Sequence, residues 1–194
     1  MTEDDPSDEA LLARVGQGDA AAFDRLYARY HGRLRQYFSR MLGADRAPDL
    51  VQEVFLRVIA GSAGLDGRGG FRTWLFTVAH NLCCNEHRQA AVRRRAAEVG
   101  ERALGPGPIA PDADEGVELA AFGLALRAEL ARLDPARRGT FLLRFQEGFS
   151  LEEIGRVMGC PVGTVKSRLF YTTRLLAGRL QAFDPRADEE VRHG

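Results

Sequence analysis

A cluster of hydrogen-bond donors and cations near the C-terminal end of the chain has the chemistry of a nucleic-acid contact. At helical spacing these side chains fall on one outward face: Thr164, Lys166, Ser167, Arg168 and Tyr171. Lys166 is the only lysine in the chain. Hydroxyls, cations and an aromatic ring are groups that contact phosphates and base edges in a DNA major groove. The cluster therefore predicts a DNA-reading helix.

A second basic group lies in the middle of the chain, on a helix expected from about residue 72 to about residue 99. Its first half carries an apolar stripe that includes Trp74 and Leu82, and its second half carries Arg88 and Arg93 to Arg95. This order indicates a buried first half and a second half that faces nucleic acid. A solvated basic helix end explains the same residues, so this segment alone leaves both interpretations open.

Two histidines and two cysteines on the same predicted helix could be metal ligands. His80, Cys83, Cys84 and His87 lie at steps that can share one face, and zinc binds such side chains. Ligands on a single straight helix rarely complete a tetrahedron, and cysteine is a common small core residue. We therefore expect no metal and no cofactor.

The sequence also lacks the arrangements that are typical of catalytic sites. His31 and His193, like the two histidines above, have no matched nucleophile or metal motif around them. The glycine-rich stretch at 61–70 is not followed by the Gly-Lys-Ser/Thr of a phosphate-binding loop. We expect no catalytic residue and predict that the chain is not an enzyme.

The DNA-reading helix needs a second element to position it, and residues 150–170 have the pattern of a helix-turn-helix. Ser150 and Glu153 are spaced as a capping box that begins the first helix. Gly159 suits the left-handed residue that ends it, and Pro161 suits the first turn of the next helix. Gly155 is small enough to let the second helix cross closely.

Apolar residues support the same interpretation. Ile154 and Met158 lie four apart on the first helix, and Val165 and Leu169 repeat that spacing on the second, so both pairs are expected to face inward. The alternative is a helical hairpin with a solvated charged face. Capping, turn, spacing and polarity all favour the helix-turn-helix.

The rest of the chain predicts helices throughout. Apolar residues recur at steps of three and four, without strand-like alternation or internal repeats, and a stretch rich in proline, glycine and acid interrupts them. The expected fold is all-α, with two small helical domains joined by a flexible linker, the second ending in the helix-turn-helix. The expected divisions are an acidic tail and short helix at 1–18, a first domain at 19–99, a linker at 100–116, a second domain at 117–183 and a tail at 184–194.

The overall composition neither indicates nor excludes nucleic-acid binding. The 194 residues carry 27 Lys plus Arg and 27 Asp plus Glu, so any such function depends on local segregation of charge. Three cysteines, two of them adjacent, do not suggest a disulfide framework. No apolar run approaches a membrane span, and the acidic start has no apolar signal core. We expect a cytoplasmic protein.

Three segments in a fixed order resemble a known family. They are DLVQEVFLR at 49–57, FRTWLFTVAHNL at 71–82 and, after the predicted linker, GCPVGTVKSR at 159–168. The chain resembles an extracytoplasmic-function (ECF) sigma factor of the sigma-70 family, and the resemblance covers residues 18–183. It implies a protein that binds core RNA polymerase and directs promoter recognition and transcription initiation.

The resemblance also implies roles for particular residues. The first domain looks like sigma region 2, in which residues matching Asp49, Gln52, Glu53 and Phe55 dock on the clamp of the polymerase's largest subunit. The loop at 61–70 and the helix from 71 match the part that reads and melts the minus-ten promoter element. Asn81 would contact a flipped-out base there. The expected phosphate contacts are Arg72, Arg88, Arg93, Arg94 and Arg95.

The second domain looks like sigma region 4, whose second helix enters the major groove of the minus-thirty-five element. The residues carried over are Thr164, Lys166, Ser167, Arg168, Phe170 and Tyr171. The resemblance also implies promoter DNA and a cognate anti-sigma factor as partners, and a linker whose acidity mimics nucleic acid in a polymerase channel.

Two departures from the family pattern bear on the promoter sequence. Cys83 to Glu86 follow Asn81 where basic residues are common, and Tyr171 stands where a basic residue is common. The alternative function is a stand-alone helix-turn-helix regulator. Such a protein usually dimerises to read two half-sites, and the chain offers no heptad seam for a dimer.

Overall fold

The computed structural model describes residues 5–60, 70–97 and 117–183, with the backbone alone at 96, 97 and 117–120. These residues form helices and no strand, which confirms the all-α prediction. In chain order the elements are α1 (Asp8–Val15), α2 (Ala20–Leu42), α3 (Ala47–Ile59), α4 (Gly70–Ala97), α5 (Val117–Ala131), α6 (Pro135–Phe145), α7 (Leu151–Met158), α8 (Val162–Arg179) and a short 3₁₀ turn, η1 (Gln181–Phe183). The loop predicted at 61–70 lies outside the described residues except for Gly70, which begins α4, and the linker at 100–116 lies outside them entirely.

Side-chain caps fix where several helices begin. The hydroxyl of Ser7 accepts a hydrogen bond from the backbone N–H of Ala10 at 3.2 Å, and α1 begins at the next residue after Ser7. Asp19 caps α2 in the same way, and Asp134 caps α6 with a proline at its first position. In all three cases the helix begins at the residue after its cap.

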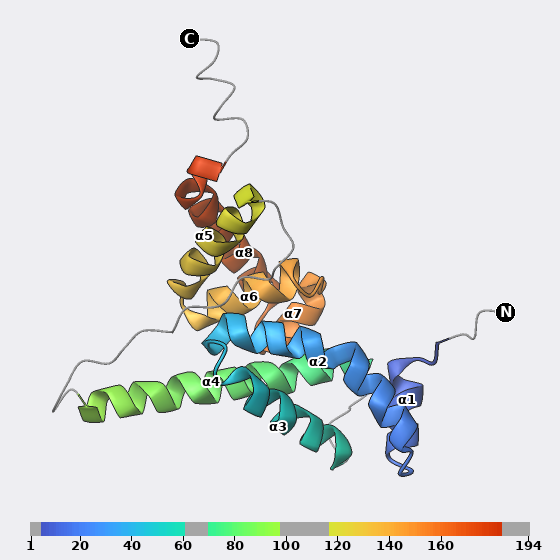
Figure 1. The fold of residues 1–194 in the computed structure, drawn as a ribbon. Helices are drawn as coiled ribbons and strands as arrows, with labels where there is room; N and C mark the ends of the chain where they lie inside the picture. The colour runs from blue at the N-terminus through green and yellow to red at the C-terminus, as the bar shows by residue number, and fades with distance from the viewer. Residues whose placement is uncertain (1–4, 61–69, 98–116, 184–194) are drawn as a thin grey trace, which may run out of the picture.

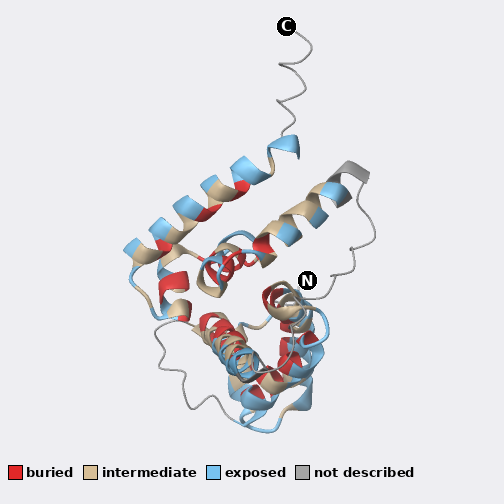
Figure 2. Cartoon of the chain, turned by 90° about the vertical axis from the view of Figure 1, so that its left-hand side faces the viewer, coloured by how far each residue is buried: buried red, intermediate tan, exposed pale blue. Residues whose placement is uncertain are grey.

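The first bundle, α1 to α4, is organised around α2 (Figure 1). Its side chains at three- and four-residue steps, among them Leu26, Leu34 and Phe38, are fully buried against α3 and α4. Burial alternates with exposure along each helix (Figure 2), as expected of amphipathic helices that share one core. Trp74, expected in the core, is only partly buried at its edge.

Helix α4 is buried in its first half and exposed in its second. Phe71, Leu75 and Phe76 are fully buried, whereas Arg93 to Arg95 are exposed. The second half extends away from both bundles (Figure 1). The helix thus has the buried first half and the accessible basic end that its sequence predicts.

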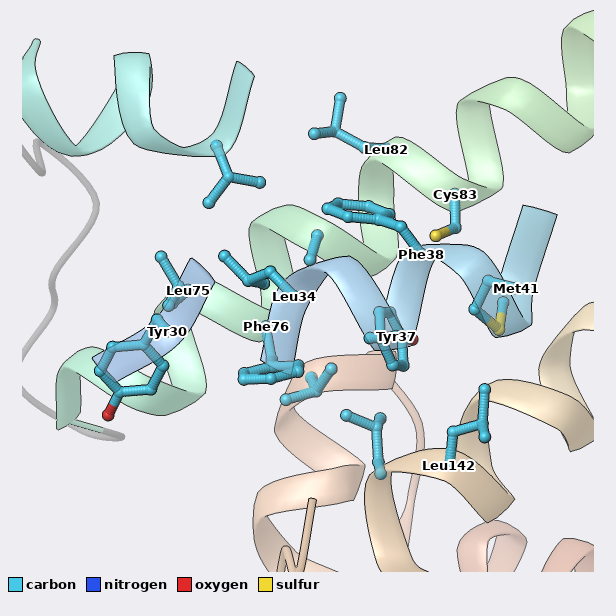
Figure 3. Packing of buried hydrophobic residues seen from close by; sticks show 14 of the residues in the cluster. Tyr30, Leu34, Tyr37, Phe38, Met41, Leu75, Phe76, Leu82, Cys83 and Leu142 are labelled. Atoms are coloured by element: carbon cyan, nitrogen blue, oxygen red, sulfur yellow. The ribbon is translucent and has the colours of Figure 1, made fainter. Parts of the chain in front are cut away.

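The second bundle, α5 to α8, packs directly on the first, which the sequence did not predict. Leu142 of α6 points toward Tyr37 and Met41 of α2 (Figure 3), and all three are buried in one continuous apolar cluster. Arg138 of α6, 7% exposed, donates to the backbone oxygens of Leu130 at 2.9 Å and of Met41 at 2.7 Å. The two bundles therefore share a core.

Candidate nucleic-acid interface

The capping box at the start of α7 forms as its spacing predicts. The N–H of Glu153 donates to Ser150 Oγ at 3.2 Å, and the N–H of Ser150 donates to Glu153 Oε2 at 2.8 Å. Burial alone raises the pKa of Glu153, but hydrogen bonds from Ser150 and the nearby cations Arg72 and Arg156 lower it overall. The carboxylate is therefore held in its charged form, in which it accepts the hydrogen bond.

The turn between α7 and α8 depends on two glycines. Gly159 is left-handed, with φ 59° and ψ 37°, as predicted for the residue that ends α7. A Cβ on Gly155 would lie 2.9 Å from the backbone oxygen of Cys160, so the close approach there is to the turn itself rather than to the body of α8. Pro161 precedes α8 as its cap residue, one position before its predicted place.

An exposed polar and aromatic stripe runs along α8. Lys166 and Ser167 are exposed, and Phe170 and Tyr171 are 59% and 61% exposed. The two rings contact each other edge to face, with centroids 5.3 Å apart. Thr164 is half-buried beside the stripe. The face that packs inward carries Val165, 0% exposed, so the helix presents its donors and cation to solvent.

Arg168 is the exception among the residues predicted on this stripe. It is half-buried, and its guanidinium donates to Cys160 Sγ at 3.6 Å. The prediction that it points outward is therefore wrong for this arrangement. Arg168 lies about 60° around the helix from the inward Val165, on the side opposite Lys166, and this position directs its side chain toward the α7–α8 turn.

Of the α4 residues predicted to contact the minus-ten element, all but one are exposed, and that one, Arg72, contacts the second bundle. The exposed set comprises Asn81, Arg88, Arg93, Arg94 and Arg95. Arg72 instead lies between the bundles, where its guanidinium carbon sits 3.9 Å from the ring centre of Phe149. It also donates a hydrogen bond to the backbone oxygen of Glu147.

A groove between α2 and α3 forms a second candidate surface, of about 390 Å³. Its floor contains Phe55, which is 3% exposed and lies 4.7 Å from the ring of Tyr27 between centroids. Leu56 and Ile59, both 56% exposed, line its rim. Exposed apolar side chains beside a hollow favour the binding of another protein.

Of the polar residues predicted for protein docking, one reaches this groove. Gln52 lines it, while Asp49 is exposed beside it and pairs with Arg46 at 3.4 Å. Glu53 pairs with Arg57 one helical turn later, at 2.6 Å. Phe55 is in the floor, not on the accessible face.

Leu56 and Ile59 were missed by sequence reasoning. A signal was present for Leu56, which falls outside the three- and four-residue spacing that buries Val54 and Val58. Ile59 follows the buried Phe55 by four residues, so the spacing gives no signal there. Apolar residues that break the period of a helix are exposed, and such residues indicate a binding surface. The pattern thus marks the rim of the groove.

His80 of α4 has a hydrogen-bond partner at each ring nitrogen, one on α2 and one on α4. His80 is 6% exposed, with Nδ1 at 3.2 Å from the Tyr37 hydroxyl and Nε2 at 3.4 Å from Cys84 Sγ. Burial, together with the nearby Arg168 and His87, lowers the pKa of His80 to about 4, so its ring is neutral at pH 7. Within the part of the chain that the structure describes, no three His, Cys, Asp or Glu residues gather as a metal site.

Comparison with known proteins assigns both bundles. Residues 26–93 match the family model for Sigma-70 region 2, and residues 123–170 match the model for Sigma-70, region 4. The ECF RNA polymerase sigma-E factor of Haemophilus influenzae is 31% identical over 190 residues, covering 90% of this chain and 96% of the relative. The ECF RNA polymerase sigma-E factor of Escherichia coli K12 is 31% identical over 187 residues, covering 90% and 95%.

Two solved structures share the fold. A sigma factor RpoE in complex with the anti-sigma factor NepR, from Bartonella quintana, superposes with a TM-score of 0.68 at 24% identity, covering 82% of this chain and 96% of its own. CnrH in complex with the cytosolic domain of CnrY gives 0.65 at 24% identity, covering 91% and 99%. No helix in the described ranges is both long enough and apolar enough to cross a bilayer.

Proposed function

The chain belongs to the ECF class of the sigma-70 family of RNA polymerase sigma factors, and on this premise we propose how its surfaces bind core polymerase and promoter DNA. The first bundle grips the polymerase and opens the minus-ten element, while the second reads the minus-thirty-five element. The domain divisions proposed for these roles are 19–99 and 117–183. Catalysis belongs to the polymerase, and the protein works beside it in the cytoplasm.

The groove between α2 and α3 is the proposed docking site for the clamp of the polymerase's largest subunit. An amphipathic helix of the partner would insert apolar side chains against Leu56, Ile59 and the buried Phe55. Asp49, Gln52 and Glu53 would hydrogen-bond at the polar rim. An apolar centre with a polar rim is typical of specific protein interfaces.

The basic half of α4 is the proposed minus-ten surface. Arg88 and Arg93 to Arg95 are exposed and would neutralise phosphates of the melted strand. Asn81 is exposed about two turns before Arg88 and more than three turns before Arg93, and its amide could hydrogen-bond a flipped base there. Arg72 would join them when it is free of Phe149.

The exposed stripe of α8 is the observation that carries the proposal. Lys166 and Ser167 reach solvent at its centre, and Phe170 and Tyr171 extend it by one turn. A helix held by a capped helix and a left-handed glycine turn, with donors on its free face, is suited to a major groove. Thr164 and Arg168 are proposed as flanking contacts.

Two further roles are proposed. One comparison structure is a sigma factor in complex with an anti-sigma factor, and we propose that this chain also has an anti-sigma partner. The acidic linker at 100–116, outside the described residues, is proposed to occupy a polymerase channel. If a variant whose linker acids are replaced by neutral residues supports normal transcription initiation by core polymerase, that role is contradicted.

Run-off transcription tests the proposed function. Purified chain added to core polymerase on fragmented genomic DNA should yield discrete transcripts that core alone does not make. The chain should also co-elute with core. A stand-alone regulator would bind duplex DNA without co-eluting with core or starting transcripts, and that result would overturn the proposal.

A further inference from the structure

Helix α1 holds the start of α4 with a carboxylate. Glu9 Oε1 accepts a hydrogen bond at 3.0 Å from the backbone N–H of Phe71, which lies in the first turn of α4. A Cβ on Gly70 would lie 3.1 Å from the same oxygen, and Gly70 is left-handed with φ 69°, so a residue without a side chain suits this approach. Among the described residues, the acceptor for this N–H thus comes from 62 positions earlier in the chain.

A cap supplied by another helix acts differently from a local cap. Ser7, Asp19 and Asp134 each accept from an N–H three residues further on, so each stabilises the first turn of its own helix. Glu9 belongs to α1, so its hydrogen bond lasts only while α4 keeps its place beside α1. The bond therefore fixes the position of α4 as well as its first turn.

Helix α1 is itself fixed to α2 by the residue before Glu9. Asp8 pairs with Arg29 of α2 at 2.6 Å and accepts a hydrogen bond from the Tyr30 hydroxyl. Burial, together with this bond to Asp8, raises the pKa of Tyr30, so the hydroxyl keeps its proton and donates it. The Tyr30 ring lies edge to face on the Phe71 ring, with centroids 5.5 Å apart. Phe71 is thus held by its backbone and by its ring.

The position of the basic end of α4 depends on the packed first half of the helix. Its buried residues lie between Phe71 and Cys83, whereas Arg93 to Arg95 are exposed. At 1.5 Å per residue, Phe71 and Arg95 lie about 18 Å on either side of Cys83. A rigid helix that pivots near Cys83 moves its basic end by about as much as its start. A binding surface needs its groups held to within about 0.5 Å, so movement at Phe71 matters for DNA.

We propose that α1 positions the minus-ten surface and that Glu9 is a positioning residue for promoter opening. Its carboxylate holds the start of α4 and thereby fixes where the basic half of α4 stands when it receives the melted strand. Glu9 itself contacts no DNA and acts through Phe71. The inference rests on the proposed minus-ten role of α4.

Substitutions in the full-length chain separate the acceptor oxygen of Glu9 from its charge. Glu9→Ala removes the acceptor for the Phe71 N–H. Glu9→Gln keeps an acceptor oxygen without the charge, so it should restore what Glu9→Ala loses. Asp24→Ala removes a carboxylate from an exposed position of α2 and is the control.

Trp74, the only tryptophan in the chain, makes the start of α4 observable. It is half-buried one turn after Phe71, with the two ring centroids 5.9 Å apart. Acrylamide should quench its fluorescence more strongly in Glu9→Ala than in the unsubstituted chain, whereas Glu9→Gln and Asp24→Ala should match the unsubstituted chain. Equal quenching in Glu9→Ala and the unsubstituted chain would overturn the inference, as would a Glu9→Gln protein that behaves like Glu9→Ala.

The second measurement is the rate of promoter opening with core polymerase, at saturating complex. Permanganate oxidises unpaired thymines, so its reactivity over time follows opening on the promoter that gives the strongest run-off transcript. A helix cap typically stabilises its structure by a factor of about five, and we expect Glu9→Ala to slow opening by about that factor. Glu9→Gln and Asp24→Ala should open at the unsubstituted rate, and all variants should bind core polymerase with equal affinity.

The rate distinguishes positioning from a loss of folded protein. A variant that is merely less stable yields less open promoter and less bound core, but its folded molecules open DNA at the unsubstituted rate. An unsubstituted rate in Glu9→Ala would therefore refute the inference, while transcripts made with the unsubstituted chain would uphold the proposed function. If the unsubstituted chain gives no transcripts, the proposed function fails, and the minus-ten role on which this inference rests fails with it.

Discussion

At the scale of single residues, Arg138 connects the two bundles through several hydrogen bonds from one side chain. It is 7% exposed, and its guanidinium donates to the backbone oxygens of Leu130, Ala131 and Leu133 and to that of Met41. Burial lowers its pKa, with Cys83 and Asp134 acting in the opposite direction. One side chain thus ends α5 and ties α6 to α2.

Replacing Arg138 should therefore be costly. Arg138→Met leaves four buried carbonyl oxygens without their donor, and we expect a loss of about 2–4 kcal/mol in the free energy of unfolding, measured by urea titration. Arg137→Ala, next to it and exposed, should change that value by less than about 0.5 kcal/mol. Equal losses in both variants would contradict the assigned role.

His80 makes stability depend on pH. Its folded pKa of about 4 lies below the unfolded value of about 6.5, so the unfolded chain binds more protons in between. Stability from this residue is complete above pH 6.5 and falls as pH drops toward 4. We expect a loss of about 2 kcal/mol from His80 between pH 7 and pH 5.

Urea titration at the two pH values checks this expectation. His80→Gln cannot become charged, so most of the difference between pH 7 and pH 5 should disappear in that variant, whatever its stability at pH 7. An unchanged difference would show that other groups, such as the half-buried His87, control it.

At the scale of elements, α8 and α3 each carry one surface that can be altered without touching the core. Lys166 is exposed on α8 and Leu56 on α3, whereas their neighbours Val165 and Phe55 are buried. Exposed substitutions should change binding, and buried ones should change folding. This contrast makes the two surfaces separable by experiment.

Lys166→Ala should weaken duplex binding at all sequences and reduce the slope of log affinity against log salt by about 1, since one phosphate contact is lost. Affinity for core polymerase should stay the same. Arg137→Ala, an exposed position of α6 outside the α8 stripe, is the control for a general loss of charge. Identical salt slopes for Lys166→Ala and the unsubstituted chain would exclude a phosphate contact.

Leu56→Asp should lower affinity for core polymerase at least about tenfold, because it places a charge on the rim of the α2–α3 groove. Helix content and random-sequence DNA binding should not change. Phe55→Ala is a poor test of docking, because loss of a buried ring costs about 3–5 kcal/mol of stability. A Leu56→Asp protein that binds core normally would remove the groove from the interface.

At the scale of the whole molecule, the two bundles share one apolar cluster across α2, α4, α6 and α7. Cooperative units are defined by shared cores, so the chain should unfold in one transition, seen alike by far- and near-ultraviolet circular dichroism. Glu147→Gln, which leaves Arg33 of α2 without its counter-charge from the second bundle, should split or broaden that transition. Two separate transitions in the unsubstituted chain would show that the bundles are independent.

The sequence by itself determined the elements. Helix caps and turns act within a few residues, so their spacing can be recognised in the sequence without the tertiary structure. The examples are the caps at Ser7, Asp19 and Asp134, the capping box at Ser150 and the left-handed Gly159. The family segments, the exposed face of α8 and the exposed end of α4 could also be predicted, because each depends on a local pattern of residues.

Only the tertiary structure decided which charged side chains are accessible. Arg72 and Arg168 were both predicted as DNA contacts, yet one lies against Phe149 and the other donates to Cys160. The docking of Glu147 on Arg33 joins residues 114 positions apart. Contacts between residues so distant in the chain depend on how separate amphipathic faces meet, and no local pattern of residue types records that choice.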